Sequence, residues 1–324
     1  MKKRIALVTG GFSGEAVISY KSAITIDNNL DREKFDVFKI DINPKGWFYE
    51  KGSEIVEVDK NDFSLKLNGE KIKFDAVFIG MHGTPGEDGK LQGYFDTLRI
   101  PYTSCDAATS AITFNKRYTV AVVKMGGINV AESVHLFRHT SYDTADILNK
   151  LKLPVFVKPN NGGSSIGMSK VHKAEDLEAA IEKAFREDDQ VLIEQMVKGR
   201  EFTVGVFKSK GETTVLPITE VMTQKDFFDY EAKYEGKSSE VTPAEISETA
   251  AGKIRNAARK IYQLLNCRGV VRIDFIYNEE IDQPFMLEVN SIPGQTDASI
   301  IPQQVKCLGW NLKEFYSKLV EEII

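Results

Sequence analysis

Cysteine is scarce in this sequence: the 324 residues include three, Cys105, Cys267 and Cys307, far apart along the chain. An odd, widely spaced set argues against a disulfide framework and favours a reducing, cytoplasmic setting. Long apolar runs are also lacking, so no segment approaches the length of a transmembrane helix. The apolar run in the opening stretch MKKRIALVTGG is too short for a signal peptide and is typical of a first buried strand.

An excess of positive charge is lacking as well. The chain has 42 Lys and Arg against 47 Asp and Glu, a formal net charge of −5, which argues against a nucleic-acid partner. What is present, 42% hydrophobic and 27% charged residues, is typical of a globular protein, and the length predicts two or three domains.

The N-terminal third alternates predicted strands with glycine-rich loops and a helix. RIALVTGG, FDVFKIDI and FDAVFIGMHG are typical of strands, and a helix is predicted over residues 15–30. This order predicts a parallel sheet whose ligands bind beyond the carboxyl ends of its strands, where TGGFSGE and MHGTPGEDG fall. The glycines of TGGFSGE do not form G-x-G-x-x-G, so a hydride-transfer enzyme is a weak hypothesis.

The rest of the chain mixes helices and strands. Helices are predicted over 110–127, 174–187 and 244–265, with a further helix near the C-terminus. Strands are predicted over 153–159, 190–197, 200–207, 213–221, 269–277 and 284–290. The segment at about 224–240 is long, charged and aromatic, which predicts a lid that becomes ordered over a polar cleft.

The stretch VFVKPNNGGSSIGMSKV, residues 155–171, is predicted to be a hairpin with a glycine-rich tip. Glycine lets the backbone approach a ligand closely, and serine hydroxyls and backbone N–H groups donate to oxyanions, with Lys158 at the mouth. This is a different motif from the P-loop, because the lysine precedes the glycines. The alternative is an ordinary surface hairpin with a polar tip.

Two strands near the C-terminus place polar side chains on one face. In VVRIDFIY, Arg272 and Asp274 alternate with apolar residues, and in FMLEVN so do Glu288 and Asn290. If the strands pair, these four side chains gather on one surface, and such oxygen ligands suit Mg²⁺ shared with phosphates. The alternative is a solvated sheet face.

Other polar residues carry weaker signals. Glu194 and Glu201 in EQMVKGREF could serve a nucleotide, or form an ordinary acidic surface turn. His82 lies in a strand-end glycine loop and could donate to a substrate carboxylate. His135 and His139 are four residues apart, but their segment is not predicted to be helical, so a shared metal is not expected.

The ordered motifs GGFSGE, MHGTPGEDGKLQG, VKPNNGGSSIGMSKV, IEQMVKGREFTV, DYEAKY, RIDF and EVNSIPG carry a resemblance. Over nearly its whole length, the chain resembles the D-alanine–D-alanine ligases of the ATP-grasp superfamily. The resemblance implies an α/β, three-domain ATP-grasp fold with a Rossmann-like, parallel-sheet domain at 1–104, a central domain at 105–194 and a C-terminal domain at 195–324. ATP would lie between the central and C-terminal sheets.

The resemblance also implies roles for individual residues. The ATP-binding set would be Lys116, Lys158, Ser165, Glu194, Gln195, Met196, Val197, Glu201 and Lys233. Two Mg²⁺ or Mn²⁺ ions would be bound by Asp274, Glu288 and Asn290.

Further roles concern the amino acids. Glu15 would hold the ammonium of the first D-alanine, with His82 near its carboxylate, and Ser299 would bind the carboxylate of the second. Ser164 and Tyr234 would form a hydrogen-bonded set with Glu15. The remaining roles are a γ-phosphate contact for Lys233 and oxyanion stabilisation by Arg272 and the Gly294 N–H.

The implied function is ATP-dependent synthesis of D-alanyl-D-alanine for peptidoglycan, and so for the cell wall and cell shape, by a cytoplasmic homodimer. D-lactate or D-serine could replace the second D-alanine, although Tyr234 in EAKY favours D-alanine. A non-catalytic nucleotide-binding regulator is the alternative from another class. The chain departs from the family pattern at Asn115, Gly162, Gln295 and Asp297.

Overall fold

The computed structural model describes residues 2–52, 54–163, 165–223 and 238–324. The N-terminal sheet has the strand order β4-β3-β2-β1-β7. Its parallel part consists of β1 (Lys3–Gly10), β2 (Phe35–Asn43) and β7 (Ala76–Ile79), as predicted. Two strands that sequence inspection missed, β3 (Gly46–Lys51) and β4 (Glu54–Glu57), extend it antiparallel. The short links before these strands cannot hold a crossover helix, so antiparallel pairing follows.

The remaining N-terminal elements surround this sheet. The predicted first helix is α1 (Ala16–Asn29), which begins directly after Glu15. The others are a small hairpin of β5 (Leu65–Leu67) and β6 (Glu70–Ile72), and the helix α2 (Lys90–Leu98).

The second sheet is antiparallel, in the order β10-β9-β11-β8. It is built from β8 (Ser133–Phe137), β9 (Val155–Pro159), β10 (Ser169–Val171) and β11 (Gln190–Gln195). Its helices are α5 (Thr144–Lys150), a 3₁₀ turn (Ala174–Asp176) and α6 (Leu177–Phe185). Val155 and Val157 are fully buried in the core with Ile181 of α6, so the alternate residues Phe156 and Lys158 lie on the opposite face.

Among the described residues, the third sheet is antiparallel and contains six strands. They are β12 (Arg200–Ser209), β13 (Glu212–Val215), β14 (Thr219–Thr223), β15 (Ser238–Val241), β16 (Val270–Asn278) and β17 (Gln283–Asn290). Helix α8 (Glu248–Leu264) packs on one face through Ile254, Ala258 and Ile261. It begins four residues later than predicted, where Ser247 Oγ accepts a hydrogen bond from Ala250 N at 3.3 Å. Two helices, α9 (Ile300–Cys307) and α10 (Leu312–Glu321), complete the chain.

The helix predicted over 110–127 is in fact two helices, α3 (Ala107–Phe114) and α4 (Lys116–Met125). Asn115 has an extended backbone and caps α4, its Oδ1 accepting from Tyr118 N at 3.1 Å. The apolar periodicity continues through Asn115, so it predicts one helix. The side chain of Asn115 instead caps a new helix, which requires an extended backbone at this position. The break places Lys116 in the first turn of α4.

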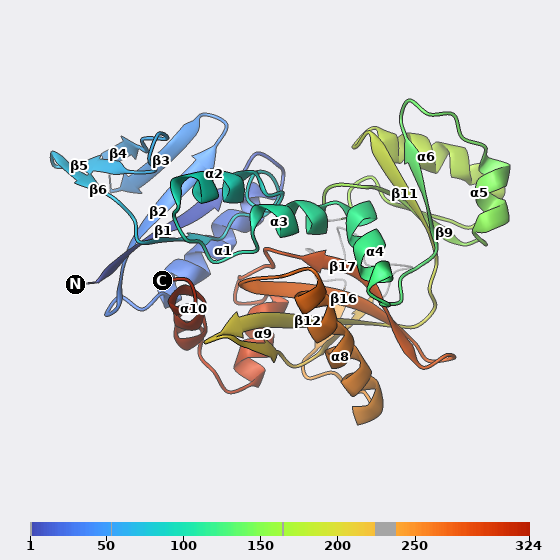
Figure 1. Ribbon diagram of the computed structural model, residues 1–324. Helices are drawn as coiled ribbons and strands as arrows, with labels where there is room; N and C mark the ends of the chain where they lie inside the picture. The colour runs from blue at the N-terminus through green and yellow to red at the C-terminus, as the bar shows by residue number, and fades with distance from the viewer. Residues whose placement is uncertain (1, 53, 164, 224–237) are drawn as a thin grey trace.

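Helices α3 and α4 lie beside β17 (Figure 1). Val120 and Val123 of α4 are in one hydrophobic cluster with Phe275 and Met286 of the third sheet. Residues 107–125 therefore pack against the C-terminal sheet, although the sequence placed them in the central region, while 133–195 form the second sheet with a core of its own.

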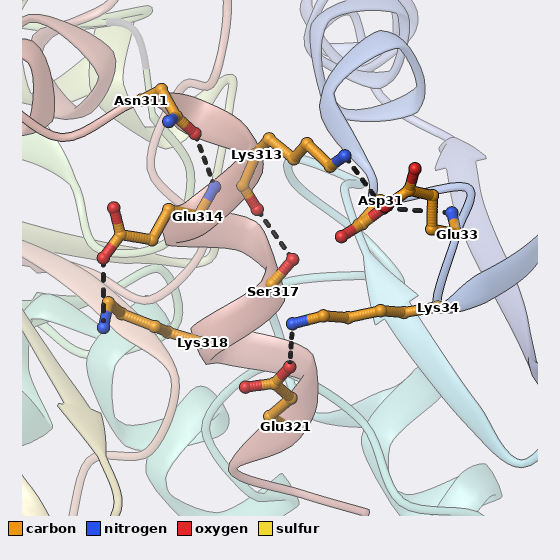
Figure 2. A network of polar contacts seen from close by, with 9 residues as sticks. All are labelled: Asp31, Glu33, Lys34, Asn311, Lys313, Glu314, Ser317, Lys318 and Glu321. Atoms are coloured by element: carbon orange, nitrogen blue, oxygen red, sulfur yellow. Dashed lines mark hydrogen bonds and ion pairs between the residues drawn. The ribbon is translucent and has the colours of Figure 1, made fainter.

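The first and last parts of the chain also share a core. Leu7 of β1 clusters with Phe207, Phe315 and Tyr316 from the C-terminal part, and the chain ends lie close together (Figure 1). Ion pairs flank this contact, Lys313 Nζ to Asp31 Oδ1 at 3.0 Å and Lys34 Nζ to Glu321 Oε1 at 2.6 Å (Figure 2). The N-terminal sheet is thus held against α10. Across the described residues, no helix has both the length and the apolar character to cross a membrane.

Candidate active site

The polar face predicted from the two C-terminal strands is present. Strands β16 and β17 pair so that Asp274 lies opposite Glu288, and Arg272 opposite Asn290. On the other side of β16, Thr203 of β12 lies opposite Asp274. Directly opposed residues of antiparallel strands share a face, so these side chains gather on one surface.

Asp274 is bonded to three neighbouring side chains of this surface. Its carboxylate accepts from Arg272 Nε and Nη2, both at 2.8 Å, from Thr203 Oγ1 at 2.5 Å and from Asn290 Nδ2 at 3.2 Å. Asp274 is 7% exposed, and Arg272 supplies the positive charge that a buried carboxylate requires.

The oxygen atoms of this surface suit a metal ion that is shared with a substrate. Among the described residues, no three His, Cys, Asp or Glu side chains form a metal-binding group. Two carboxylates and an amide oxygen, from Asp274, Glu288 and Asn290, still fit Mg²⁺, which commonly takes one or two carboxylates and completes its shell with phosphate and water. The protein would therefore supply only some of the metal ligands, and phosphate and water would supply the others.

A cavity of about 620 Å³ lies between the second and third sheets. It is lined by every described residue that the sequence assigned to ATP: Lys116, Lys158, Ser165, Glu194, Gln195, Met196, Val197 and Glu201. Asp274 and Glu288 line its wall as well. The cavity therefore extends from β11 to the polar surface of β16 and β17.

Three of these residues, Lys158, Glu194 and Gln195, have partners that sequence reasoning did not anticipate. Glu194 forms an ion pair with Lys158, and both side chains are nearly buried. The Gln195 side chain is bonded to the backbone of Lys152, accepting from its N at 2.5 Å and donating to its O at 2.6 Å. The amide of Gln195 is thus already engaged on the side of the sheet away from Glu194.

The glycine-rich hairpin tip reaches the N-terminal part of the chain. Lys116 Nζ donates to Gly162 O at 2.5 Å. A Cβ at Gly163 would lie 2.7 Å from Glu15 Oε1, and one at Gly83 would lie 2.7 Å from Glu15 Oε2. The Glu15 carboxylate is therefore held between two glycines, and a side chain at either would strike it.

A second cavity, of about 410 Å³, continues from this point. Its wall contains the described residues predicted for the amino acids: Glu15, His82, Arg272, Gly294 and Ser299. Glu15, Lys116, Glu201, Asp274 and Glu288 line both cavities, so the two spaces adjoin. A nucleotide in the first could meet a small molecule in the second at this junction.

His82 is less available than the sequence suggested. Its Nδ1 lies 2.8 Å from Ile292 O and its Nε2 lies 3.0 Å from Ser22 Oγ. Next to a carbonyl, Nδ1 must carry the proton, so Nε2 accepts from Ser22. Burial lowers the pKa of His82 to about 4, which keeps the ring neutral. In this arrangement no ring N–H remains for a substrate carboxylate, and His82 instead links α1 to the segment 291–294.

Glu87, in the GEDG part of the second glycine loop, was not singled out from sequence. Its carboxylate accepts from Gly83 N at 3.1 Å and Ile292 N at 3.4 Å. Burial and the neighbouring Glu15 raise the pKa of Glu87 well above its usual range. The backbone of Ile292 is therefore hydrogen-bonded at its N–H by Glu87 and at its carbonyl by His82. No local pattern could have indicated this, because Ile292 is distant in sequence.

The segment after β17 contains two other predicted residues and two departures from the family pattern. Ser299 Oγ accepts from Thr296 N at 3.1 Å, and a Cβ at Gly294 would lie 2.9 Å from that hydroxyl oxygen. Gln295 is buried, its N donating to Ser22 Oγ at 3.2 Å and its Oε1 accepting from Tyr316. Asp297 faces solvent, 3.6 Å from Lys306 Nζ.

Three predicted site residues, Ser164, Lys233 and Tyr234, lie outside the described residues, as does the predicted lid apart from its last three positions.

Two family models match the chain. A family model described as the D-ala D-ala ligase N-terminus matches residues 4–105, and one described as the D-ala D-ala ligase C-terminus matches 122–324. A protein from Flavobacterium johnsoniae named D-alanine–D-alanine ligase is 46% identical over 320 residues, covering 98% of each chain.

Two solved structures are similar along the whole length. The VanG D-Ala:D-Ser ligase from Enterococcus faecalis has a TM-score of 0.89 at 32% identity, covering 99% of each chain. The D-alanyl-alanine synthetase A from Vibrio cholerae has a TM-score of 0.87 at 31% identity, covering 98% of this chain and 97% of that one.

Proposed function

The chain belongs to the D-alanine–D-alanine ligase family and has its ATP-grasp fold, and from this premise we propose that it joins two molecules of D-alanine with hydrolysis of ATP. The observation that carries the proposal is the pair of adjoining cavities. A nucleotide-sized space and a smaller polar space share Glu15, Asp274 and Glu288 in their walls. ATP and a small carboxylic acid can therefore meet at one polar surface.

We assign the larger cavity to ATP. Lys158 and Lys116 supply positive charge for the phosphates, and the backbone of the hairpin tip supplies N–H donors beside them. Glu201 is placed to accept from ribose hydroxyls, and residues 195–197 border the space for the base. Asp274, Glu288 and Asn290 would hold Mg²⁺ or Mn²⁺, which when bound neutralises charge on the phosphates.

We assign the smaller cavity to the two amino acids. Glu15 carries the negative charge that a D-alanine ammonium needs, between Gly83 and Gly163. Ser299 stands at the N-terminus of α9, where a hydroxyl and the helix dipole favour a carboxylate, and is assigned to the second D-alanine. His82 and Glu87 position the segment 291–294 that lies between these two sites.

The reaction follows from charge. A carboxylate oxygen of the first D-alanine attacks the γ-phosphorus of ATP, the bond to ADP breaks, and D-alanyl phosphate forms. The amine of the second D-alanine then attacks the carbonyl carbon, loses a proton, and displaces inorganic phosphate. Arg272 and the Gly294 N–H are assigned to the oxyanion of the tetrahedral intermediate, where one donor contributes about 3 kcal/mol.

The product, D-alanyl-D-alanine, is a building block for peptidoglycan precursors, and we place the enzyme in the cytoplasm as a homodimer acting in cell-wall synthesis. Light scattering tests the dimer, with about twice the chain mass of 36.3 kDa expected. A single-chain mass at micromolar concentration would contradict it.

One alternative acceptor has support, because the similar VanG protein is a D-Ala:D-Ser ligase. Phosphate release from ATP and Mg²⁺ should be measured with D-alanine, L-alanine, D-serine and D-lactate, and the products identified by mass spectrometry. D-Alanine should support turnover without a second amino acid or hydroxy acid, and the product should be D-alanyl-D-alanine. A requirement for D-serine would reassign the acceptor, and no turnover with any amino acid would favour a nucleotide-binding regulator.

A further inference from the structure

Glu240 is a carboxylate that the proposed reaction has not used. It lies on β15, the edge strand of the third sheet, opposite Val221 of β14, and Val221 lies opposite Glu201 of β12. Opposed side chains in an antiparallel ladder share a face, so Glu240 is on the same face as Glu201. It is half-buried and lines the smaller cavity together with Ser299.

The position of this carboxylate is set by Gln303 of α9. Gln303 Nε2 donates to Glu240 Oε2 at 2.6 Å and to Ala298 O at 2.8 Å. One amide group therefore bridges Glu240 to the residue directly before Ser299. Within the described part of the chain, Gln303 is the one residue that bonds this carboxylate, and it engages one of the two oxygens.

The charge of the acceptor differs between an amino acid and a hydroxy acid. This step rests on the proposed function, in which Ser299 binds the acceptor carboxylate. An amino acid at neutral pH carries its ammonium one carbon away from its carboxylate. When Ser299 and the start of α9 hold the acceptor carboxylate, the ammonium must lie within a few ångströms. A hydroxy acid of the same size offers a neutral hydroxyl there and has a net negative charge.

We propose that Glu240 determines acceptor specificity: its carboxylate selects an acceptor with an ammonium group over one with a hydroxyl. The negative charge attracts the ammonium of D-alanine and repels the uncompensated carboxylate of D-lactate, so one group both favours the right acceptor and disfavours the wrong one. For a partly solvated pair of charges, a preference of roughly tenfold is expected.

The test is a competition at pH 7 with ATP, Mg²⁺ and equal D-alanine and D-lactate, with both products quantified. In Glu240→Gln the ratio of dipeptide to depsipeptide should fall about tenfold relative to the native enzyme. A second competition, D-alanine against D-serine, should give an unchanged ratio, because both acceptors carry an ammonium. Glu245→Gln, which removes the same charge from an exposed position two residues after Pro243, is the matched control and should change neither ratio.

Gln303→Lys offers an independent route, because it places a cation beside Glu240 without altering that residue. It should lower the D-alanine to D-lactate ratio in the same direction as Glu240→Gln. The inference is overturned if both variants turn over with the native ratio, or if Glu240→Gln shifts the D-serine and D-lactate ratios equally. An inactive native enzyme would overturn the proposed function itself. An active enzyme whose ratio of dipeptide to depsipeptide is unchanged by Glu240→Gln would overturn only this inference.

Discussion

Replacing Gly163 with alanine should damage the donor site while leaving the fold nearly intact. The added Cβ would lie 2.7 Å from Glu15 Oε1, well inside van der Waals contact. That oxygen is the end of a flexible side chain, so Glu15 can move away at small cost in folding free energy. We expect the free energy of unfolding to change by less than about 1 kcal/mol.

The cost should appear in catalysis. A carboxylate displaced from the donor ammonium loses a charge-assisted contact worth about 1.5–3 kcal/mol, which corresponds to roughly a 10- to 150-fold fall in kcat/KM for the first D-alanine. Initial rates of phosphate release over a range of D-alanine concentrations measure this. The two D-alanine sites separate as two KM values, and the donor KM should rise.

Gly162→Ala is the matched control from the same hairpin tip. Gly162 has φ of +100°, and a Cβ there would meet no atom within 4 Å. Alanine should strain the backbone by about 1 kcal/mol or more and spare Glu15. A Gly163→Ala enzyme with the native donor KM would refute the placement of the donor ammonium at Glu15.

Three further predictions follow from the same contacts. Asp274→Asn and Glu288→Gln should each reduce phosphate release by about two orders of magnitude or more while retaining cooperative unfolding, and near-native rates would refute the metal assignment. The pKa of His82 is lowered to about 4 in the folded chain, so between pH 6.5 and 4 the unfolded chain binds a proton at His82 that the folded chain does not. The free energy of unfolding should therefore fall by about 3 kcal/mol as the pH is lowered from 6.5 to 4. In His82→Gln this part of the pH dependence should be absent from urea unfolding curves. Lys158→Met should lower the free energy of unfolding by about 3 kcal/mol, since it leaves Glu194 buried and unpaired, and raise the KM for ATP; a loss below about 1 kcal/mol would show that the pair contributes little.

Side-chain alternation made part of the site predictable. Arg272 and Asp274 are two residues apart on one strand, as are Glu288 and Asn290 on the next, so their common face needed only that the strands pair. The glycine-rich stretch at 155–171 likewise indicated a hairpin, because apolar flanks typical of strands surround residues typical of turns. The absence of a side chain at Gly163 leaves room for Glu15, because a Cβ there would lie 2.7 Å from Glu15 Oε1.

Contacts between distant loops were not predictable. His82 and Ile292 are 210 positions apart, and nothing in either local pattern indicates that they meet. Glu87 and Glu240 escaped notice for the same reason, since each is tied to a residue from another part of the fold. The break at Asn115 was missed because the apolar period of α3 and α4 continues across it, while the cap depends on one side-chain oxygen.

We expect the chain to activate D-alanine as an acyl phosphate before ligation. D-Alanine labelled with oxygen-18 in its carboxyl group tests this directly, with the released phosphate analysed by mass spectrometry. The donor carboxylate oxygen that attacks ATP leaves with the phosphate, so each phosphate should contain one labelled oxygen, and the dipeptide should retain the other three. Unlabelled phosphate released together with dipeptide would contradict the account.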